Sequence, residues 1–139
     1  DAEAHGNNDV IAQSIEIPNA VAVEGGSAII QSIMILDEDD EAPSIDLIFQ
    51  TDNTALASDE GEAVNISDAN ARDILGFVNV SNYTDLLNCQ VGIKTNIGLV
   101  VKAASTTKSI FVHAVNRSGG TYTPAATTDL KMKIGIVKD

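Results

Sequence analysis

The side chains of this chain that could do chemistry are few, and the most prominent are five consecutive acids, Asp37 to Glu41. Clustered carboxylate oxygens suit Ca²⁺ or Mg²⁺, so a cation site is one interpretation of the run. The run lacks the Asp-x-Asp-x-Asp-Gly spacing of an EF-hand loop, and consecutive residues do not all point at one ion. We therefore expect no metal, and we interpret the run as an acidic turn in water, because five adjacent carboxylates do not enter a core. A third interpretation is that it meets a basic patch on a neighbouring subunit.

The residues that could catalyse a reaction do not form a known constellation. His5 lies in a polar N-terminal stretch, and His113 lies among alternating apolar residues, which is typical of a packed or interfacial histidine. Cys89 has no CxxC partner, and Ser27 follows two glycines without the G-x-S-x-G pattern of a nucleophile elbow. The chain also has no phosphate-binding glycine motif. We predict that the protein is not an enzyme and has no cofactor.

The charges are divided unevenly along the chain, whose formal net charge is −12. Residues 1–70 hold sixteen acids and no lysine or arginine, whereas the rest holds eight basic residues and four acids. Such an acidic chain is repelled by nucleic acid, so we expect no nucleic-acid partner. The asymmetry favours contact between the halves, either within one subunit or head-to-tail between subunits. The alternative is that a sheet interleaves the two halves and dilutes the asymmetry.

Pairing between subunits would involve the acidic run and two late lysines. The predicted partner-binding residues are Asp37, Glu38, Asp39, Asp40, Glu41, Lys131 and Lys133. If they pair across an interface, reversing the acids to lysines should weaken assembly at low salt, with less effect at high salt.

The elements that position these residues are predicted to be strands. Residues 28–36 alternate between two faces that are both mostly aliphatic, which favours a strand covered on both sides. Pro43 closes a turn after the acids, and residues 45–49 resume the alternation. We interpret the whole stretch as a β-hairpin with an acidic tip.

The rest of the chain predicts further short strands at 10–17, 21–23, 63–66, 77–80 and at several places from Cys89 onward, including 121–123 and ending with 130–136. Ser67 is a good N-cap for one short helix that would end at Gly76. The predicted fold class is all-β: a β-sandwich or jelly-roll-like barrel with one short helix. We expect a flexible N-terminal arm at 1–9, one domain at 10–139 and a surface loop at 50–61. No run approaches the roughly 20 apolar residues of a membrane span, so no membrane is expected.

Three stretches together resemble a family of small structural proteins of tailed bacteriophages. They are GGSAIIQSIMILDEDDEAPSIDLIF (25–49), ISDANARDILGFVNV (66–80) and NIGLVVKAASTTKSIFVHAVNRSGGTYT (96–123). The resemblance carries no catalytic motif and implies a β-rich component of the virion, which we expect to be a capsid decoration, or cement, protein.

On this resemblance the expected partners are further copies of the chain, as a homotrimer, and the major capsid protein, at the capsid surface of the virion. Capsid lattices offer local three-fold axes, and closed rings are the usual homo-oligomers. Alternatives are a tail, neck or baseplate protein of the virion, or a glycan- or receptor-binding β-sandwich.

Overall fold

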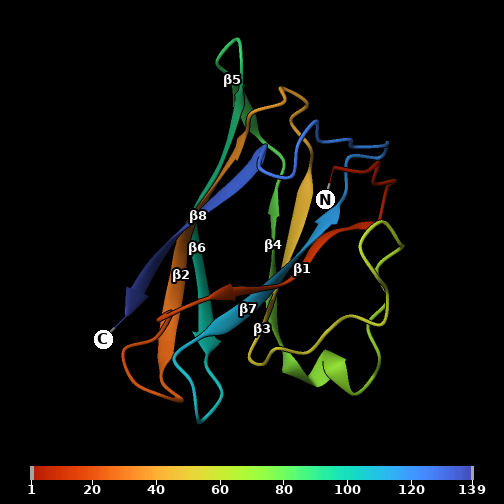
Figure 1. Ribbon diagram of the computed structural model, residues 1–139. Helices are drawn as coiled ribbons and strands as arrows, with labels where there is room; N and C mark the ends of the chain where they lie inside the picture. Colours follow the sequence, from red (N-terminus) through yellow and green to blue (C-terminus); the bar gives the residue numbers. More distant parts are fainter. Residues whose placement is uncertain (1, 139) are drawn as a thin grey trace.

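The computed structural model, described over residues 2–138, consists of two antiparallel sheets packed face to face (Figure 1). The strands are β1 (Val10–Ile17), β2 (Ser27–Asp37), β3 (Ile45–Gln50), β4 (Ile74–Val80), β5 (Tyr83–Asp85), β6 (Gln90–Lys102), β7 (Ile110–Asn116) and β8 (Leu130–Lys138). The first sheet has the strand order β1-β7-β3-β4, and the second sheet has the order β5-β6-β2-β8. The predicted all-β sandwich is therefore confirmed.

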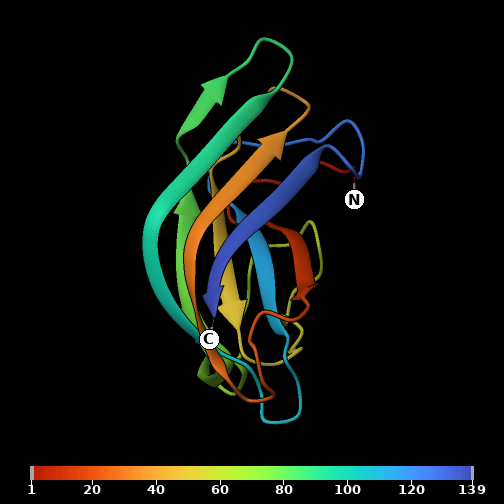
Figure 2. The same ribbon diagram turned by 90° about the vertical axis from the view of Figure 1, so that its left-hand side faces the viewer.

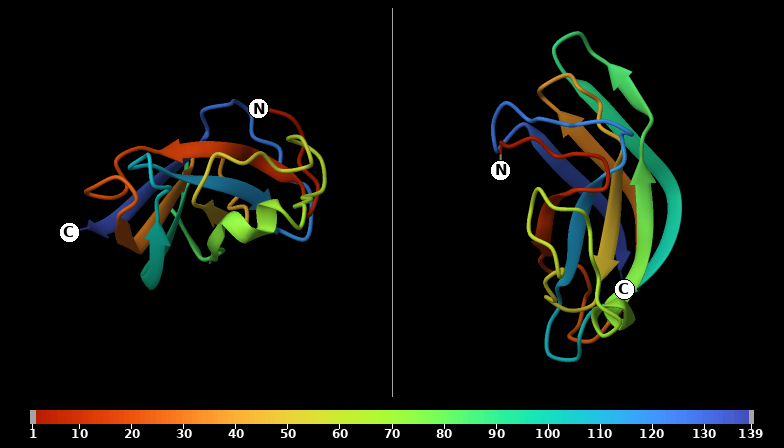
Figure 3. Two further views of the ribbon diagram at one scale, coloured as in Figure 1. Left: turned by 90° about the horizontal axis from the view of Figure 1, so that it is seen from below. Right: turned by 90° about the vertical axis from the view of Figure 1, so that its right-hand side faces the viewer.

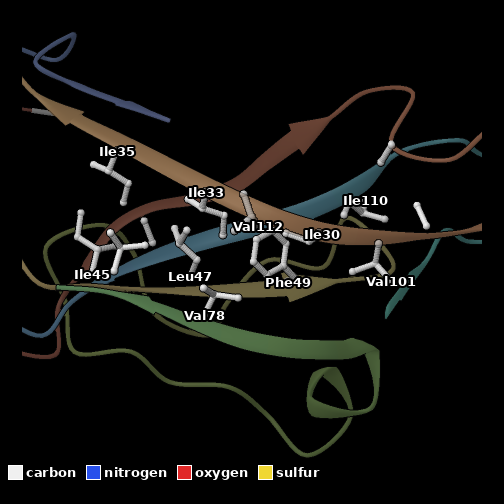
Figure 4. Packing of buried hydrophobic residues seen from close by; sticks show 14 of the residues in the cluster. Ile30, Ile33, Ile35, Ile45, Leu47, Phe49, Val78, Val101, Ile110 and Val112 are labelled. Carbon is white, nitrogen blue, oxygen red and sulfur yellow. The ribbon is translucent and has the colours of Figure 1, made fainter. Parts of the chain in front are cut away.

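The core between the sheets is almost entirely aliphatic. Ile30, Ile33 and Ile35 of β2 point across the interior towards Leu47 and Phe49 of β3 (Figure 4). Each is buried, and burying such a side chain stabilises the fold by about 1.5–3 kcal/mol. Alternation along the strands thus places one face of each sheet in a shared core.

The predicted hairpin is wrong, because β2 and β3 belong to different sheets. β2 lies between β6 and β8, and β3 lies between β7 and β4, so each strand already has a neighbour on both sides. Residues 38–44 cross from one sheet to the other instead of turning back within one. Alternation showed that both segments are strands, but it carries no information on which strands pair.

The predicted helix at 67–76 is reduced to the single 3₁₀ turn η1 (Asn70–Asp73). The predicted N-cap at Ser67 is wrong, because the residue that caps this turn is Ala69, although Ser67 Oγ still accepts the Asn70 N–H at 3.2 Å. From Ile74 onward, however, the chain pairs with β3, where Ile74 lies opposite Gln50. Pairing with β3 is favoured over the predicted helix, because a helix this short forms too few hydrogen bonds to offset the free-energy cost of starting it.

Three short predicted strands are also absent from the described chain. Residues 21–23 form turns, while Ala63 and Tyr122 each make only an isolated bridge, with Asp9 and His5 respectively. His5 and Tyr122 exchange two main-chain hydrogen bonds of 2.8 and 2.9 Å, which ties the expected N-terminal arm to the body. Its mobility stays a prediction, and Asp1 lies outside the described residues.

The long connection from Thr51 to Ala69 covers part of the outer face of the β1-β7-β3-β4 sheet, as the views from below and from the side indicate (Figure 3), while Phe77 on β4 stays 61% exposed. Val10, Ile48, Leu56 and Val115 are buried but lie outside the main core. Two hydrogen bonds fix the connection to β1. Gly61 N–H donates to the main-chain carbonyl of Val10, and Leu56 N–H donates to the side-chain Oε1 of Gln13. The predicted surface loop therefore acts as a cover for part of one sheet.

Candidate binding surface

The acidic run begins with a buried carboxylate, so the prediction that all five acids stay in water is wrong for Asp37. Its side chain is fully buried and accepts three main-chain N–H bonds, from Asp39 at 3.1 Å, Glu41 at 2.8 Å and Ala42 at 2.7 Å. A buried carboxylate is tolerated when such donors replace water. Asp37 therefore fixes the path of the chain between the two sheets.

The other four acids of the run each have a partner in the same chain. Glu38 forms an ion pair with Lys131, and Asp40 accepts a bond from Gln90 Nε2 at 2.8 Å. Asp39 and Glu41 accept main-chain N–H bonds from Ala125 at 3.0 Å and Thr123 at 3.1 Å. The run thus holds the 121–129 segment against this end of the sandwich.

The two halves of the chain meet within one subunit. Strands of the acidic half lie next to strands of the basic half in both sheets, and Arg117 pairs with Asp46 at 2.8 Å. The structure brings Lys131 to the acidic run, but Lys133 lies one row further along β8. A role for these residues towards another subunit stays a prediction.

The described residues contain no group of three or more His, Cys, Asp or Glu side chains arranged to hold a metal ion. The five neighbouring carboxylates bind different partners: Asp37 accepts three main-chain N–H bonds, and each of the other four contacts a different residue elsewhere in the chain.

His113 is fully buried under the cover of the first sheet. Ser14 N–H donates to its Nδ1 at 3.0 Å, so the ring proton must be on Nε2, which donates to Gln50 Oε1 at 2.7 Å. Burial lowers the pKa of His113. The second histidine, His5, is also buried, and burial is the main cause that lowers its pKa. Both rings are shielded from solvent, which suits a structural role.

The outer face of the second sheet is apolar and uncovered. Val100, Ile29 and Val137 lie side by side across β6, β2 and β8, and their exposed fractions are 62%, 39% and 58%. Ile93 and Met34 form a second row with Lys133. Figure 2 shows these strands with no segment of the chain crossing in front of them. Since outward positions of such sheets are usually polar, this face is an unusual surface.

Within the strands of this uncovered face, the charged outward positions are lysines, and one of them, Lys131, pairs with the exposed Glu38 that follows β2. Lys102, Lys131 and Lys133 take outward positions, and no described outward position on its four strands holds an acid. A shallow hollow of about 180 Å³ lies among Met34, Leu36 and the stems of Lys131 and Lys133. In a chain of net charge −12, this face is therefore distinct, because its surface is largely apolar and the charged side chains on its strands are lysines.

A second apolar feature is a cleft of about 290 Å³ between the edge strands β1 and β8. Its walls include Ile11, Ile15, Leu47, Tyr122, Leu130 and Met132. The buried Tyr122 hydroxyl has no hydrogen-bond partner among the described residues. Burial, together with the carboxylates of the acidic run, raises its pKa.

The sequence partly revealed these surfaces. It showed that both faces of 28–36 are aliphatic, but the expectation that both are covered is wrong, because only the inner face is covered in the described chain. The cleft could not be found, since it combines residues from distant strands and the 121–129 segment.

None of the described residues forms a helix long and apolar enough to span a membrane. Comparison with family models, curated proteins and solved structures found no match to this chain, so the resemblance to phage structural proteins stays a prediction.

Proposed function

We propose that this protein is a non-enzymatic structural component of a phage virion, a decoration protein that binds the outer surface of the assembled capsid as a homo-oligomer. A molecule that binds only the assembled shell stabilises that shell by mass action. The resemblance in three stretches of sequence motivates the assignment, and the uncovered sheet face supports it.

The observation that carries the proposal is the contrast between the two outer faces. One is partly covered by the chain's own 51–69 connection and leaves Phe77 exposed at its β4 end, whereas the other has no cover and exposes the whole row Val100, Ile29 and Val137. Removing apolar surface from water contributes about 25 cal/mol per Å², so docking this face onto another protein is favourable. The face as a whole is complementary to an apolar surface that has acidic groups beside it, because those acids can pair with its lysines. We assign that partner surface to the major capsid protein.

The test compares two substitutions of exposed valines. Val100→Asp places a charge in the uncovered face, while Val23→Asp places the same charge at a 63% exposed position in the 18–26 connection. Each purified variant is added to phage shells that lack the protein, and we measure the bound fraction and the temperature at which the shells open. Wild type and Val23→Asp should bind and raise that temperature, whereas Val100→Asp should bind at least tenfold more weakly.

Two outcomes oppose the proposal. Failure of the wild type to bind any shell would refute the decoration role, and equal binding of both variants would refute the assignment of the face. Labelling at the tail, neck or baseplate of the intact particle would favour the alternative virion position. The chain's two tyrosines, Tyr83 and Tyr122, would be the aromatic residues for stacking on a sugar, but both bury their hydroxyls, which opposes the glycan-binding alternative.

A further inference from the structure

The last strand, β8, is an edge strand whose outer side has no partner in residues 2–138. It pairs with β2 alone, in an unbroken register from Lys138 to Leu130 apart from the bulge that β2 makes at Gln31. Its nine residues extend about 30 Å, and they include no proline. The edge strand β1 of the first sheet is different. It is bulged, and the main chain of its Val10 already forms hydrogen bonds with residues 61 and 62. A long, regular, free edge is a template for pairing with another strand.

The inward side chains of β8 are incompletely covered. Leu130, Met132, Ile134 and Ile136 face the core but remain half-exposed. The apolar cleft between β8 and β1 opens beside the first two of them. A strand added to β8 would therefore extend the inner layer and cover apolar surface that this chain leaves open.

The sequence of β8 is complementary to itself. Ile134 is the midpoint of Leu130–Lys138, so antiparallel pairing of two copies about Ile134 uses the whole strand. In this register Met132 lies opposite the second copy's Ile136 on the inner face. On the outer face Lys131 lies opposite Val137, and Lys133 lies opposite Gly135. No lysine faces a lysine, whereas a register centred on Met132 or Lys133 would place lysines together.

We propose that two copies of this chain pair antiparallel through β8 about Ile134, which joins their second sheets into one continuous eight-stranded sheet. The inference rests on the proposed homo-oligomer and specifies its contact, and it gives the oligomer two-fold symmetry in place of the three-fold symmetry that the resemblance led us to expect. The uncovered outer faces of both copies then lie on the same continuous sheet.

The test is a cysteine scan of β8 in a Cys89→Ser background, which removes the chain's single native thiol. In the proposed register residue 134 lies opposite itself, at a Cα separation of about 4.5–5.5 Å that a disulfide can bridge. Ile134→Cys should therefore give a covalent dimer under mild oxidation of dilute protein. Ile136→Cys should not, because residue 136 lies about 13 Å from its own copy. Met132→Cys with Ile136→Cys should again cross-link.

Non-reducing electrophoresis and intact mass identify the products, and sedimentation equilibrium of the unmodified protein gives its mass in solution. The expected result is a dimer of wild type and cross-linking of the Ile134→Cys variant at least tenfold faster than that of Ile136→Cys. A wild-type monomer or trimer at high concentration, or equal cross-linking of the two single variants, would overturn the inference. A monomer that still binds shells would leave the proposed function standing, so the two failures are distinguishable.

Discussion

His113 illustrates how a single buried polar residue is fixed by its neighbours. The bulge of β1 presents Ser14 N–H to Nδ1, and Gln50 of β3 accepts the proton on Nε2. Adding a proton at Nδ1 would set two donors against each other in a site shielded from water. The interpretation of His113 as a packed residue agrees with this burial, but its two partners could not be read from the sequence because they lie 99 and 63 residues away.

The lowered pKa of His113 predicts a pH dependence of stability. Below pH 6.5, the ordinary pKa of histidine, His113 is protonated in the unfolded chain but still neutral in the folded chain. Protons therefore stabilise the unfolded chain, and the free energy of unfolding falls as the pH falls. Below the lowered folded pKa this contribution no longer changes. For one histidine the slope is at most about 1.4 kcal/mol per pH unit.

The measurement is urea unfolding of wild type and His113→Gln between about pH 7.5 and 5. The difference between the two proteins isolates His113 from the carboxylates and from His5. We expect wild type to lose more stability than the variant over this range. Parallel curves for the two proteins would show that His113 titrates alike in the folded and unfolded chains.

At the scale of elements, the β2–β3 connection decides how the sheets are joined. The sequence identifies both strands by their alternation, yet the acidic segment between them crosses the sandwich instead of forming a hairpin. Asp37 sets this path through three main-chain bonds, and Asp40 and Ala42 adopt positive φ values of 61° and 52° within it. Alanine rarely adopts a positive φ, and Asp40 does not differ in type from the other acids of the run, so the sequence did not predict the crossing.

Replacing Asp37 tests this crossing. Asp37→Ala leaves three N–H donors without their acceptor, and we expect the free energy of unfolding to fall by about 3 kcal/mol. Glu38→Gln is the matched control, since an exposed ion pair such as Glu38–Lys131 contributes only about 0–1 kcal/mol. Chemical denaturation of both variants measures the two changes. Equal small losses would mean that the loop holds its path without the buried carboxylate.

At the scale of the whole molecule, the chain's charge asymmetry is resolved by interleaving. Strands of the acidic half lie beside strands of the basic half in both sheets, and the ion pairs Arg117–Asp46 and Lys131–Glu38 join one half to the other. The sequence left open whether the halves meet within or between subunits. The structure shows that they meet within one chain. The uncovered face and the β8 edge are the surfaces that we propose for assembly.

The N-terminal segment links the same two halves, and its removal is a whole-molecule test. Asn116 Nδ2 donates to the carbonyls of His5 and Gly6 at 2.8 and 3.0 Å, and Asn8 N–H donates to the Asn116 carbonyl. Deleting residues 1–8 exposes these groups and uncovers the buried Tyr122. We expect a loss of at least about 2 kcal/mol in the free energy of unfolding.

Thermal and chemical unfolding of the deletion variant measure that loss, and deletion of residues 1 and 2 alone is the control, with a smaller change expected. If the longer deletion is as stable as the full chain, the segment is the flexible arm that its polar composition predicts.

The sequence by itself determined the fold class and most of the strands, because alternation of aliphatic and polar residues is a local property that each strand carries. It also indicated that 28–36 has two apolar faces, which is the origin of the uncovered surface. Only the tertiary structure decided which strands are neighbours, which carboxylate is buried and which apolar face stays open. Those outcomes depend on contacts between residues far apart in the chain, such as Gln50 with His113 or β2 with β8, and no local pattern encodes them.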